Sequence, residues 1–276
     1  MTGVQTCALP IFGTGIVTVR LLRPGRSVVG VDRSAGMAAV AAGRLPGRIT
    51  LGNVTRLPLA SGSADVMTMV WLLHLLRAAE VAAALAEAGR VLRQGGLLIT
   101  TVGKDDAAFG PADDAAAIMG PVRARFDPGQ TDRLDRVLAA ARRHGLTLAA
   151  QTTFVGMGQG VSPRRWRKRL AGNAFPWMAA AGRERIGALC AELASLPDQD
   201  RVRPDPVYQL AALRKGAPLG LGSRVLAPRD QDFHRPRSSV PRLRISVARS
   251  RISTLRILPV TVIGNSSTMC TYLGIL

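Results

Sequence analysis

Short apolar runs recur along the first 215 residues, each followed by a longer stretch of different periodicity. The clearest run is 27–32 (SVVGVD), which has three valines and a glycine and ends in an acid. A run of this kind is typical of a parallel strand buried on both faces. The same pattern predicts further strands at 48–51, 64–73, 97–102, 146–154 and 206–213.

Helical periodicity fills the intervals between these runs. Residues 78–92 (AAEVAAALAEAGRVL) have an amphipathic pattern that ends before Gly95 and Gly96. Ser34 can cap a helix that continues to about Gly43, and weaker patterns predict helices at 15–22 and 132–144. Strands that alternate with helices predict an α/β fold with a doubly wound parallel sheet. Such sheets bind ligands beyond the carboxyl ends of their strands.

Candidate binding residues stand at these predicted strand ends. Gly13, Thr14 and Gly15 would let the backbone approach a ligand closely and begin the next helix tightly. Asp32 can accept both hydroxyls of a ribose, although an ordinary helix-capping acid is the alternative. Asn53 could accept the amino group of an adenine through its amide oxygen.

Five segments in this order resemble the motif series of class I S-adenosylmethionine-dependent methyltransferases. They read GTG, VVGVDRSAGM, GNVTRLPL with GSADV, LLHLL, and AEAGRVLRQGGLLIT. The resemblance is close over 13–102 and looser to about 215, where PVYQLAALRKG resembles the antiparallel last strand of the family. It implies a Rossmann-like fold, S-adenosyl-L-methionine as cofactor and methyl transfer as the reaction.

The resemblance also assigns roles by position. Gly13 and Gly15 would lie against the methionine part of the cofactor, and Asp32 would hold the ribose. The other implied cofactor contacts are Thr14 in the glycine turn, Arg33 and Met37 beside the adenosine, Asn53 and Val54 on the adenine, and Val70 and Trp71 after the fourth strand. His74 follows on the substrate side, where it could act as a base or orient the acceptor. The alternative is that His74 only structures the turn in WLLHLL.

The first strand departs from the family pattern D-x-G-x-G-x-G. Leu9 and Ile11 stand where the acid and the first glycine are expected. Residues 2–11 (TGVQTCALPI) also match, without a gap, the translation of the common sequencing adapter ACT GGA GTT CAG ACG TGT GCT CTT CCG ATC; a genuine loop is the alternative. We therefore expect 1–11 to be an artefact, the chain to be N-terminally truncated and the first strand to be largely missing. We also expect the cofactor to bind poorly or not at all.

The predicted methyltransferase domain covers residues 12–215. Insertions at 103–130 and 156–205 would form the substrate side, the second as a helical lid. In that lid, Trp166, Phe175 and Trp177 could line an apolar pocket, and the nearby arginines could hold an acidic group or RNA. Alternatively, the aromatic residues are only the core of the lid. Residues 216–276 lose the alanine-rich composition and are expected to be disordered or non-native, or to form a basic arm.

The net charge of +19 raises nucleic-acid binding as an alternative. Only Lys104, Lys168 and Lys215 are lysines, so the excess of arginine also fits a G+C-rich genome. The three cysteines and three histidines lack metal-ligand spacing, which argues against a zinc site. The sequence shows no run of about 20 apolar residues and no signal peptide, so we expect a cytoplasmic protein without a membrane partner.

Four functional hypotheses follow from these observations. The first is a small-molecule methyltransferase, and the second is an RNA methyltransferase, which the charge favours. The third is a nicotinamide-dependent oxidoreductase, since a glycine turn and an acid after the second strand fit that class too. The GNV, LPL, SADV and LLHLL segments favour methyl transfer over hydride transfer. The fourth hypothesis is an inactive fragment. The acceptor and the oligomeric state stay open.

Overall fold

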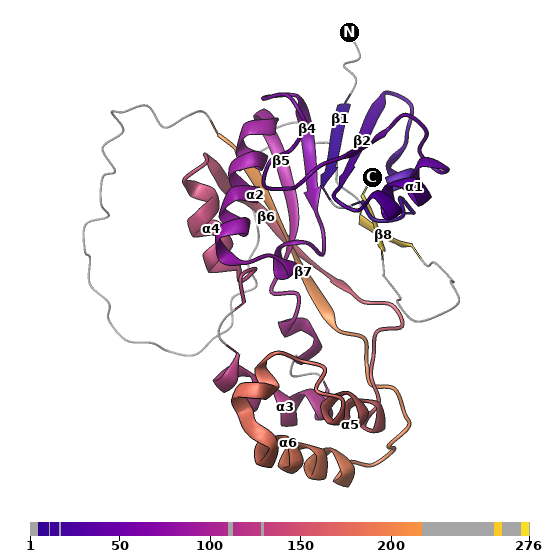
Figure 1. Cartoon of the computed structure of the whole chain (residues 1–276), viewed down its shortest axis with the longest axis vertical. Helices are drawn as coiled ribbons and strands as arrows, with labels where there is room; N and C mark the ends of the chain where they lie inside the picture. The colour runs from indigo at the N-terminus through magenta and orange to yellow at the C-terminus, as the bar shows by residue number, and fades with distance from the viewer. Residues whose placement is uncertain are drawn as a thin grey trace, which may run out of the picture.

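The computed structural model describes residues 5–10, 12–16, 18–109, 113–127, 130–216, 257–260 and 272–275. Its centre is a seven-stranded sheet with the strand order β3-β2-β1-β4-β5-β7-β6 (Figure 1). The strands are β1 (Gln5–Pro10), β2 (Arg26–Asp32), β3 (Ile49–Leu51), β4 (Ala64–Met69), β5 (Leu92–Val102), β6 (Leu146–Val155) and β7 (Val207–Lys215). The first five are parallel, and β7 runs antiparallel to both of its neighbours. A separate antiparallel pair joins β8 (Ile257–Val260) to β9 (Tyr272–Ile275).

The expectation that the first strand is largely missing is wrong for this structure. Residues Gln5–Pro10 form β1 in the interior of the sheet, parallel to both β2 and β4. The physical reason is the side chains: Cys7, Ala8 and Leu9 are small or apolar and are at most 6% exposed. Pro10 ends the strand, because it has no backbone N–H to donate to a neighbour. Whether residues 1–11 are an artefact is a separate question, and that hypothesis stays untested.

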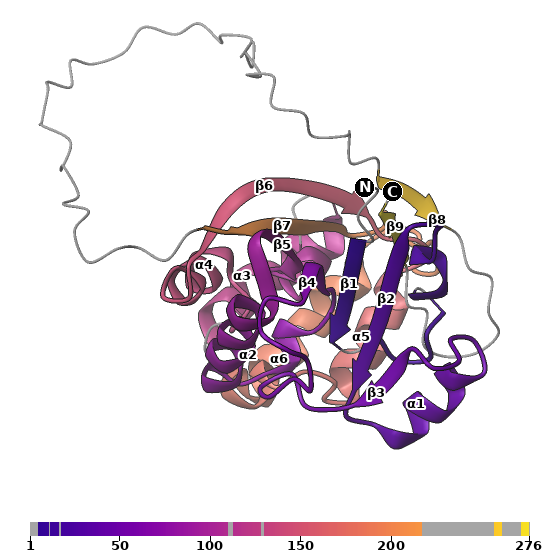
Figure 2. The ribbon, with the colours of Figure 1, turned by 90° about the horizontal axis from the view of Figure 1, so that it is seen from above.

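Helices cover both faces of the sheet, as the doubly wound prediction requires. On one face, α2 (Ala78–Val91) and α4 (Leu134–Arg142) pack against the sheet around a large core that includes Ala8, Met67 and Leu85 (Figure 2). On the other, α1 (Ala35–Ala42) covers a smaller core that includes Cys7 and Leu9. Successive β1 residues therefore point into opposite cores, as a strand period of two dictates.

Most predicted elements are confirmed within a few residues, and three differ. The helix expected at 15–22 is only a short 3-10 helix, Thr18–Leu21, because Pro24 disfavours helical backbone at the residue before it. β4 ends at Met69, and Leu73–Leu75 form another 3-10 turn. β5 begins at Leu92, directly after α2. The predictions for 216–276 fall outside the described residues, apart from Gly216 and the β8–β9 pair.

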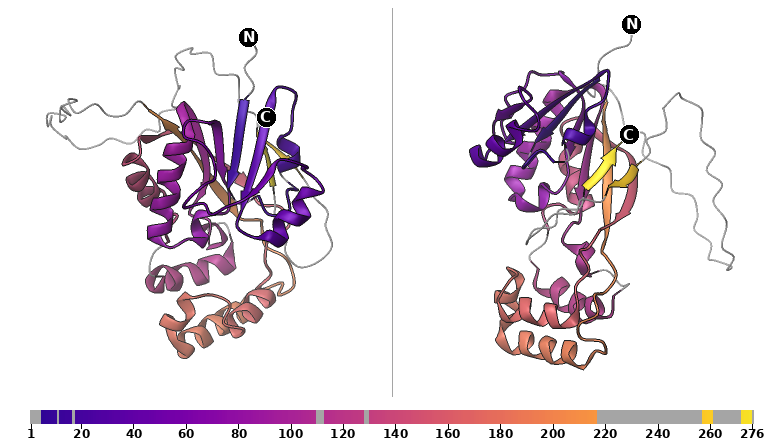
Figure 3. Two further views of the ribbon diagram at one scale, coloured as in Figure 1. Left: turned by 45° about the horizontal axis from the view of Figure 1, so that its top comes forward. Right: turned by 90° about the vertical axis from the view of Figure 1, so that its right-hand side faces the viewer.

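A helical cap stands beyond the carboxyl ends of the parallel strands (Figures 1 and 3). It contains α3 (Asp114–Phe126) from the first insertion, and α5 (Pro163–Ala171) and α6 (Trp177–Ser195) from the second. Trp166 and Trp177 are 2% and 4% exposed, and they pack with Met119, Leu170 and Leu189. The two tryptophans of the lid therefore belong to the core of the cap, whereas Phe175 is only partly buried and lines a cleft.

Candidate active site

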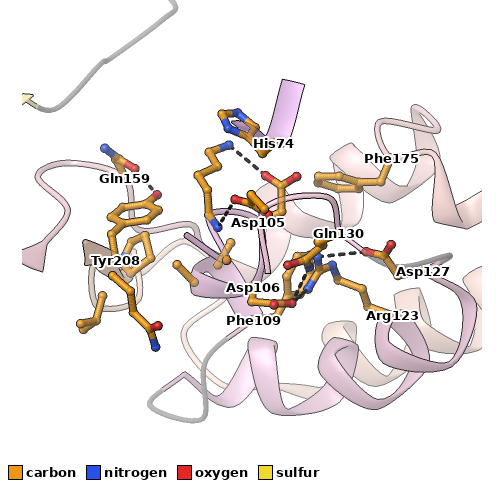
Figure 4. Close-up of a pocket in the computed structure, with 18 of the residues that line it drawn as sticks. His74, Asp105, Asp106, Phe109, Arg123, Asp127, Gln130, Gln159, Phe175 and Tyr208 are labelled. Carbon is orange, nitrogen blue, oxygen red and sulfur yellow. Dashed lines mark hydrogen bonds and ion pairs between the residues drawn. The ribbon is translucent and has the colours of Figure 1, made fainter. Parts of the chain in front are cut away.

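A cleft of about 1840 Å³ separates the cap from the strand ends. Its sheet side comes from the segments after β4 and β5 and from the start of β7. Its cap side includes Phe109, Phe175 and Arg123, and Figure 4 shows His74 and Tyr208 facing the same space. Of the predicted site residues, Trp71 and His74 line this cleft. The predicted cofactor residues of β1 and β2 lie at neighbouring strand ends, outside its lining.

The glycine turn and Asp32 meet at the ends of β1 and β2. The backbone N–H of Gly13 donates to Asp32 Oδ2 at 3.0 Å, and the N–H of Ser34 donates to Oδ1 at 2.9 Å. Asp32 is 5% exposed, yet a carboxylate offers about four acceptor positions, so two remain. Gly13 has φ +54°, and a Cβ placed on it would meet nothing within 4 Å. The backbone therefore faces open space beside a carboxylate with spare acceptor capacity.

Gly15 serves the packing of α1 against the sheet. Its φ is +74°, and an added Cβ would lie 3.1 Å from both Ala41 Cβ and Leu45 Cδ1. A larger residue would be strained and would push α1 outward. The carbonyl of Thr14 accepts a hydrogen bond from Arg44 Nη1 at 2.8 Å, which ties the turn to the end of the same helix.

The residues predicted to border the adenosine differ in their exposure to solvent. Asn53 is exposed, and its Oδ1 already accepts the N–H of Thr55 at 3.0 Å. Val54 is 8% exposed and belongs to the main core. Met37 is 45% exposed, and Arg33 is exposed too. The structure thus leaves Asn53 and Met37 accessible at the edge of the sheet, while Val54 is mostly enclosed.

Trp71 has a strained backbone at the mouth of the cleft, just after the half-buried Val70. Its φ is +61°, a conformation that is costly for a bulky residue. Its N–H donates to Thr101 Oγ1 at 2.9 Å, and its ring lies 4.8 Å from that of Tyr208, centroid to centroid. Lys104 Nζ is 5.6 Å from the indole centroid. These contacts hold an aromatic surface where the fourth strand ends.

His74 is held neutral by its surroundings. Burial, together with the positive charge of Lys104, lowers its pKa to about 4, while Asp105 opposes the shift. Its Nδ1 is buried and has no hydrogen-bond partner in the structure. Buried polar atoms normally have partners. At neutral pH, His74 is therefore an uncharged imidazole with an unsatisfied ring nitrogen beside the cleft.

Tyr208 is a residue of this cleft that the sequence did not reveal. Its hydroxyl donates to Gln159 Oε1, and its ring lies between those of Trp71 and Phe154. Burial raises its pKa to about 12, helped by Asp105 and Asp205. Only two tyrosines occur in the chain, but the antiparallel placement of β7 is what brings this one to Trp71.

An ion-pair cluster around the buried Arg123 forms the floor of the cleft on the cap side. Arg123 is 5% exposed; it pairs with Asp106 and, at 3.0 Å, with Asp127. Its guanidinium also lies 4.6 Å from the centroid of the Phe109 ring. Gln130 Nε2 donates to Asp106 Oδ1 at 2.6 Å. These contacts tie the segment after β5 to α3 and so fix one wall of the cleft.

The described residues contain no group of three or more His, Cys, Asp or Glu side chains that could hold a metal ion. Within the same ranges, no helix combines the length and the apolar character that crossing a membrane requires.

Comparisons with known proteins agree with the fold. A family model described as "Methyltransferase domain" matches residues 12–100. An uncharacterized methyltransferase of Geobacillus kaustophilus is 32% identical over 157 residues, which are 54% of this chain and 73% of that protein. One from Mycobacterium bovis is 34% identical over 118 residues, 41% of this chain and 47% of the relative. A crystal structure of a Bacillus halodurans protein, taken to be a methyltransferase, superposes with a TM-score of 0.50 at 18% identity, over 78% of this chain and 94% of the other.

Proposed function

The chain belongs to the class I S-adenosylmethionine-dependent methyltransferases, and we propose that it transfers a methyl group from S-adenosyl-L-methionine to a small molecule. The acceptor would lie in the cleft between the sheet and the helical cap. The observation that carries this proposal is the position of the cleft, which opens at the ends of β4 and β5, beside the turn where Gly13 meets Asp32. The cap-side wall is rich in aromatic residues, which suits an acceptor with an apolar body.

The residues at the ends of β1 and β2 fit the nucleoside half of this cofactor. The free acceptor positions of Asp32 would take the ribose hydroxyls, and the open face of Gly13 would allow close approach. Thr14, Arg33, Met37, Asn53 and Val54 would border the adenosine, and Val70 and Trp71 would border the reacting end. When bound, the cofactor supplies a methyl group on a sulfonium, which is a good leaving group.

The methionine half of the site departs from the family. Leu9 occupies the position of the expected acid and is buried in the core under α1. It offers no charge to an ammonium group, and the pattern also lacks the first glycine. We therefore propose that the chain binds the cofactor weakly, even though β1 is in place.

His74 fits an orienting role better than that of a strong base. With a pKa of about 4, it would have to take a proton from a hydroxyl whose pKa is about 10 or more, which is unfavourable by about six units. As a neutral ring that lines the cleft, it can instead orient the acceptor so that a lone pair points at the methyl group. Positioning alone supplies much of the rate enhancement of such displacements.

Release of S-adenosylhomocysteine from radiolabelled S-adenosylmethionine would test the proposal. A bacterial cell extract would be split into metabolites below about 1 kDa and total RNA, and each fraction would be offered to the full chain. We expect turnover with the metabolite fraction and less turnover with the His74→Ala variant. Turnover with RNA alone would contradict the small-molecule acceptor, and turnover that His74→Ala leaves unchanged would remove His74 from the mechanism.

A further inference from the structure

Two arginines on α5 face the cleft without an acidic partner. Arg165 and Arg169 are one helical turn apart, and both line the cleft. Their neighbour Arg164 pairs with Asp200 at 2.6 Å, and Arg203 pairs with Asp114 at 2.8 Å. Within the described ranges, neither Arg165 nor Arg169 forms a salt bridge. Arg167 and Lys168 of the same helix form no salt bridge with a described residue either, but they lie outside the cleft lining, so Arg165 and Arg169 are the cations of α5 that face the cleft without a carboxylate.

The surroundings of Arg169 make this arrangement costly. Its side chain is half-buried, and its guanidinium lies 5.1 Å from the centroid of the Trp166 ring. Burial lowers its pKa, and the charge of Arg165 lowers it further, with no carboxylate acting in the opposite direction. Two like charges on a partly desolvated wall repel each other. A bound anion would relieve that repulsion.

Among the described residues, no acid that lines the cleft forms a salt bridge with this pair, and three of these acids pair with other cations. Asp106 pairs with Arg123, Asp105 with Lys104 at 3.0 Å, and Asp135 with Arg133 at 3.2 Å. The positive end of the cleft therefore stays distinct from its acidic floor. Near the two arginines, the cleft wall is apolar. It is formed by the half-buried ring of Phe175, whose centroid lies 5.9 Å from that of the buried Trp166 ring.

We propose that Arg165 and Arg169 bind a carboxylate or phosphate group of the methyl acceptor, while its apolar body packs against the half-buried Phe175. The guanidinium groups can grip either oxyanion through paired N–H donors. Figure 4 shows Phe175 on the cap side of the cleft and His74 nearer the strand ends. An acceptor anchored on the cap would thus reach toward the proposed methyl donor. This inference rests on the proposed function for the identity of the ligand, but anion binding can be measured without turnover.

The test is calorimetric titration of the full chain with phenyl phosphate, benzoate and the uncharged benzamide. We expect the better of the two anions to bind at least about tenfold more tightly than benzamide, since charge-assisted hydrogen bonds provide that difference. The variant Arg165→Gln/Arg169→Gln should lose this preference. Lys168→Gln is the matched control, because it removes one charge from the same helix outside the cleft lining. It should keep the preference.

If phenyl phosphate binds more tightly than benzoate, the site prefers a phosphate group; if benzoate binds more tightly, the site prefers a carboxylate. Arg165→Lys/Arg169→Lys keeps the charge and should bind with intermediate affinity, which provides a folded comparison if the glutamine variant is unstable. Equal binding of benzamide and both anions by the wild-type chain would overturn the proposal. So would an unchanged preference in the glutamine variant, or displacement of benzoate by an RNA oligonucleotide at lower concentration than by phenyl phosphate. Anion binding without any binding of S-adenosylhomocysteine would instead contradict the proposed function and leave the anion site intact.

Discussion

Replacement of Asp32 by Asn tests the proposed ribose site at its centre. The two carboxylate oxygens of Asp32 accept backbone N–H groups of Gly13 and Ser34, at 3.0 and 2.9 Å. An asparagine has one acceptor oxygen and one NH₂ group, so one of these N–H groups would face another donor. At 5% exposure, water cannot easily replace the lost acceptor. The substitution thus changes the glycine turn and the ribose contacts together.

The size of the effect follows from these contacts. Leaving one buried N–H without an acceptor costs about 1–3 kcal/mol of folding stability. A hydrogen bond to a charged group contributes about 1.5–3 kcal/mol. If both ribose hydroxyls lose such a partner, S-adenosylhomocysteine should bind more weakly by about 3 kcal/mol, or on the order of a hundredfold.

Calorimetric titration with S-adenosylhomocysteine measures the binding change, and thermal unfolding without ligand measures the stability change separately. Asp200→Asn is the matched control, since this exposed acid pairs with Arg164 and lies outside the cleft lining. It should leave affinity unchanged. If Asp32→Asn unfolds at nearly the wild-type temperature and binds the ligand less than about threefold more weakly, Asp32 does not hold the ribose.

Four further predictions follow from the same structure. Because the pKa of His74 is lowered to about 4 in the folded chain, the unfolded chain binds the extra proton more readily below pH 6.5. Stability should therefore fall as the pH drops from 7 toward 4; His74→Gln should reduce that fall in thermal unfolding, and an identical pH profile would argue against the shift. Arg123→Met should lower the unfolding free energy by about 1.5 kcal/mol in urea, because it removes the ion pairs of this buried guanidinium with Asp106 and Asp127, whose carboxylates keep contact with solvent; a loss below about 0.5 kcal/mol would show that the cluster is not structural. Tyr208→Phe keeps the ring contact with Trp71 and removes the donor to Gln159, so it should cost only about 1 kcal/mol, whereas a cost like that of Tyr208→Ala would contradict this division. The buried Leu9 predicts that S-adenosylhomocysteine binds more weakly than in the micromolar range, and a micromolar titration would refute that.

The strand-end residues were the part of the site that local sequence signals could predict. The run SVVGVD predicted a strand that the structure confirms as β2, with Asp32 as its last residue. Ser34 caps α1 as predicted, because its side chain accepts the N–H of Met37. Each of these rests on a period of two or on a cap, and both are local properties. The alternating pattern and the resemblance together predicted the doubly wound sheet.

The other parts of the cleft depend on contacts between segments that are distant in the sequence. Tyr208 reaches Trp71 only because β7 inserts antiparallel beside β5. The pairing of Arg203 with Asp114 joins residues 89 positions apart, so no local pattern shows which arginines of the cap stay free. The first strand was misjudged because its resemblance to a translated adapter outweighed the fit of its short apolar side chains to the interior of a sheet. Burial depends on the neighbouring strands, whatever the origin of the residues.

The central claim is that the strand ends around Gly13 and Asp32 bind S-adenosylmethionine and not a nicotinamide cofactor. Thermal unfolding of the full chain with millimolar S-adenosylhomocysteine or NAD tests this most directly, since a ligand of the folded state raises the unfolding temperature even when it binds weakly. We expect S-adenosylhomocysteine to raise the unfolding temperature, NAD to leave it unchanged, and the Asp32→Asn variant to lose the effect of S-adenosylhomocysteine. An unfolding temperature that rises with NAD alone would contradict the assignment of this site to S-adenosylmethionine.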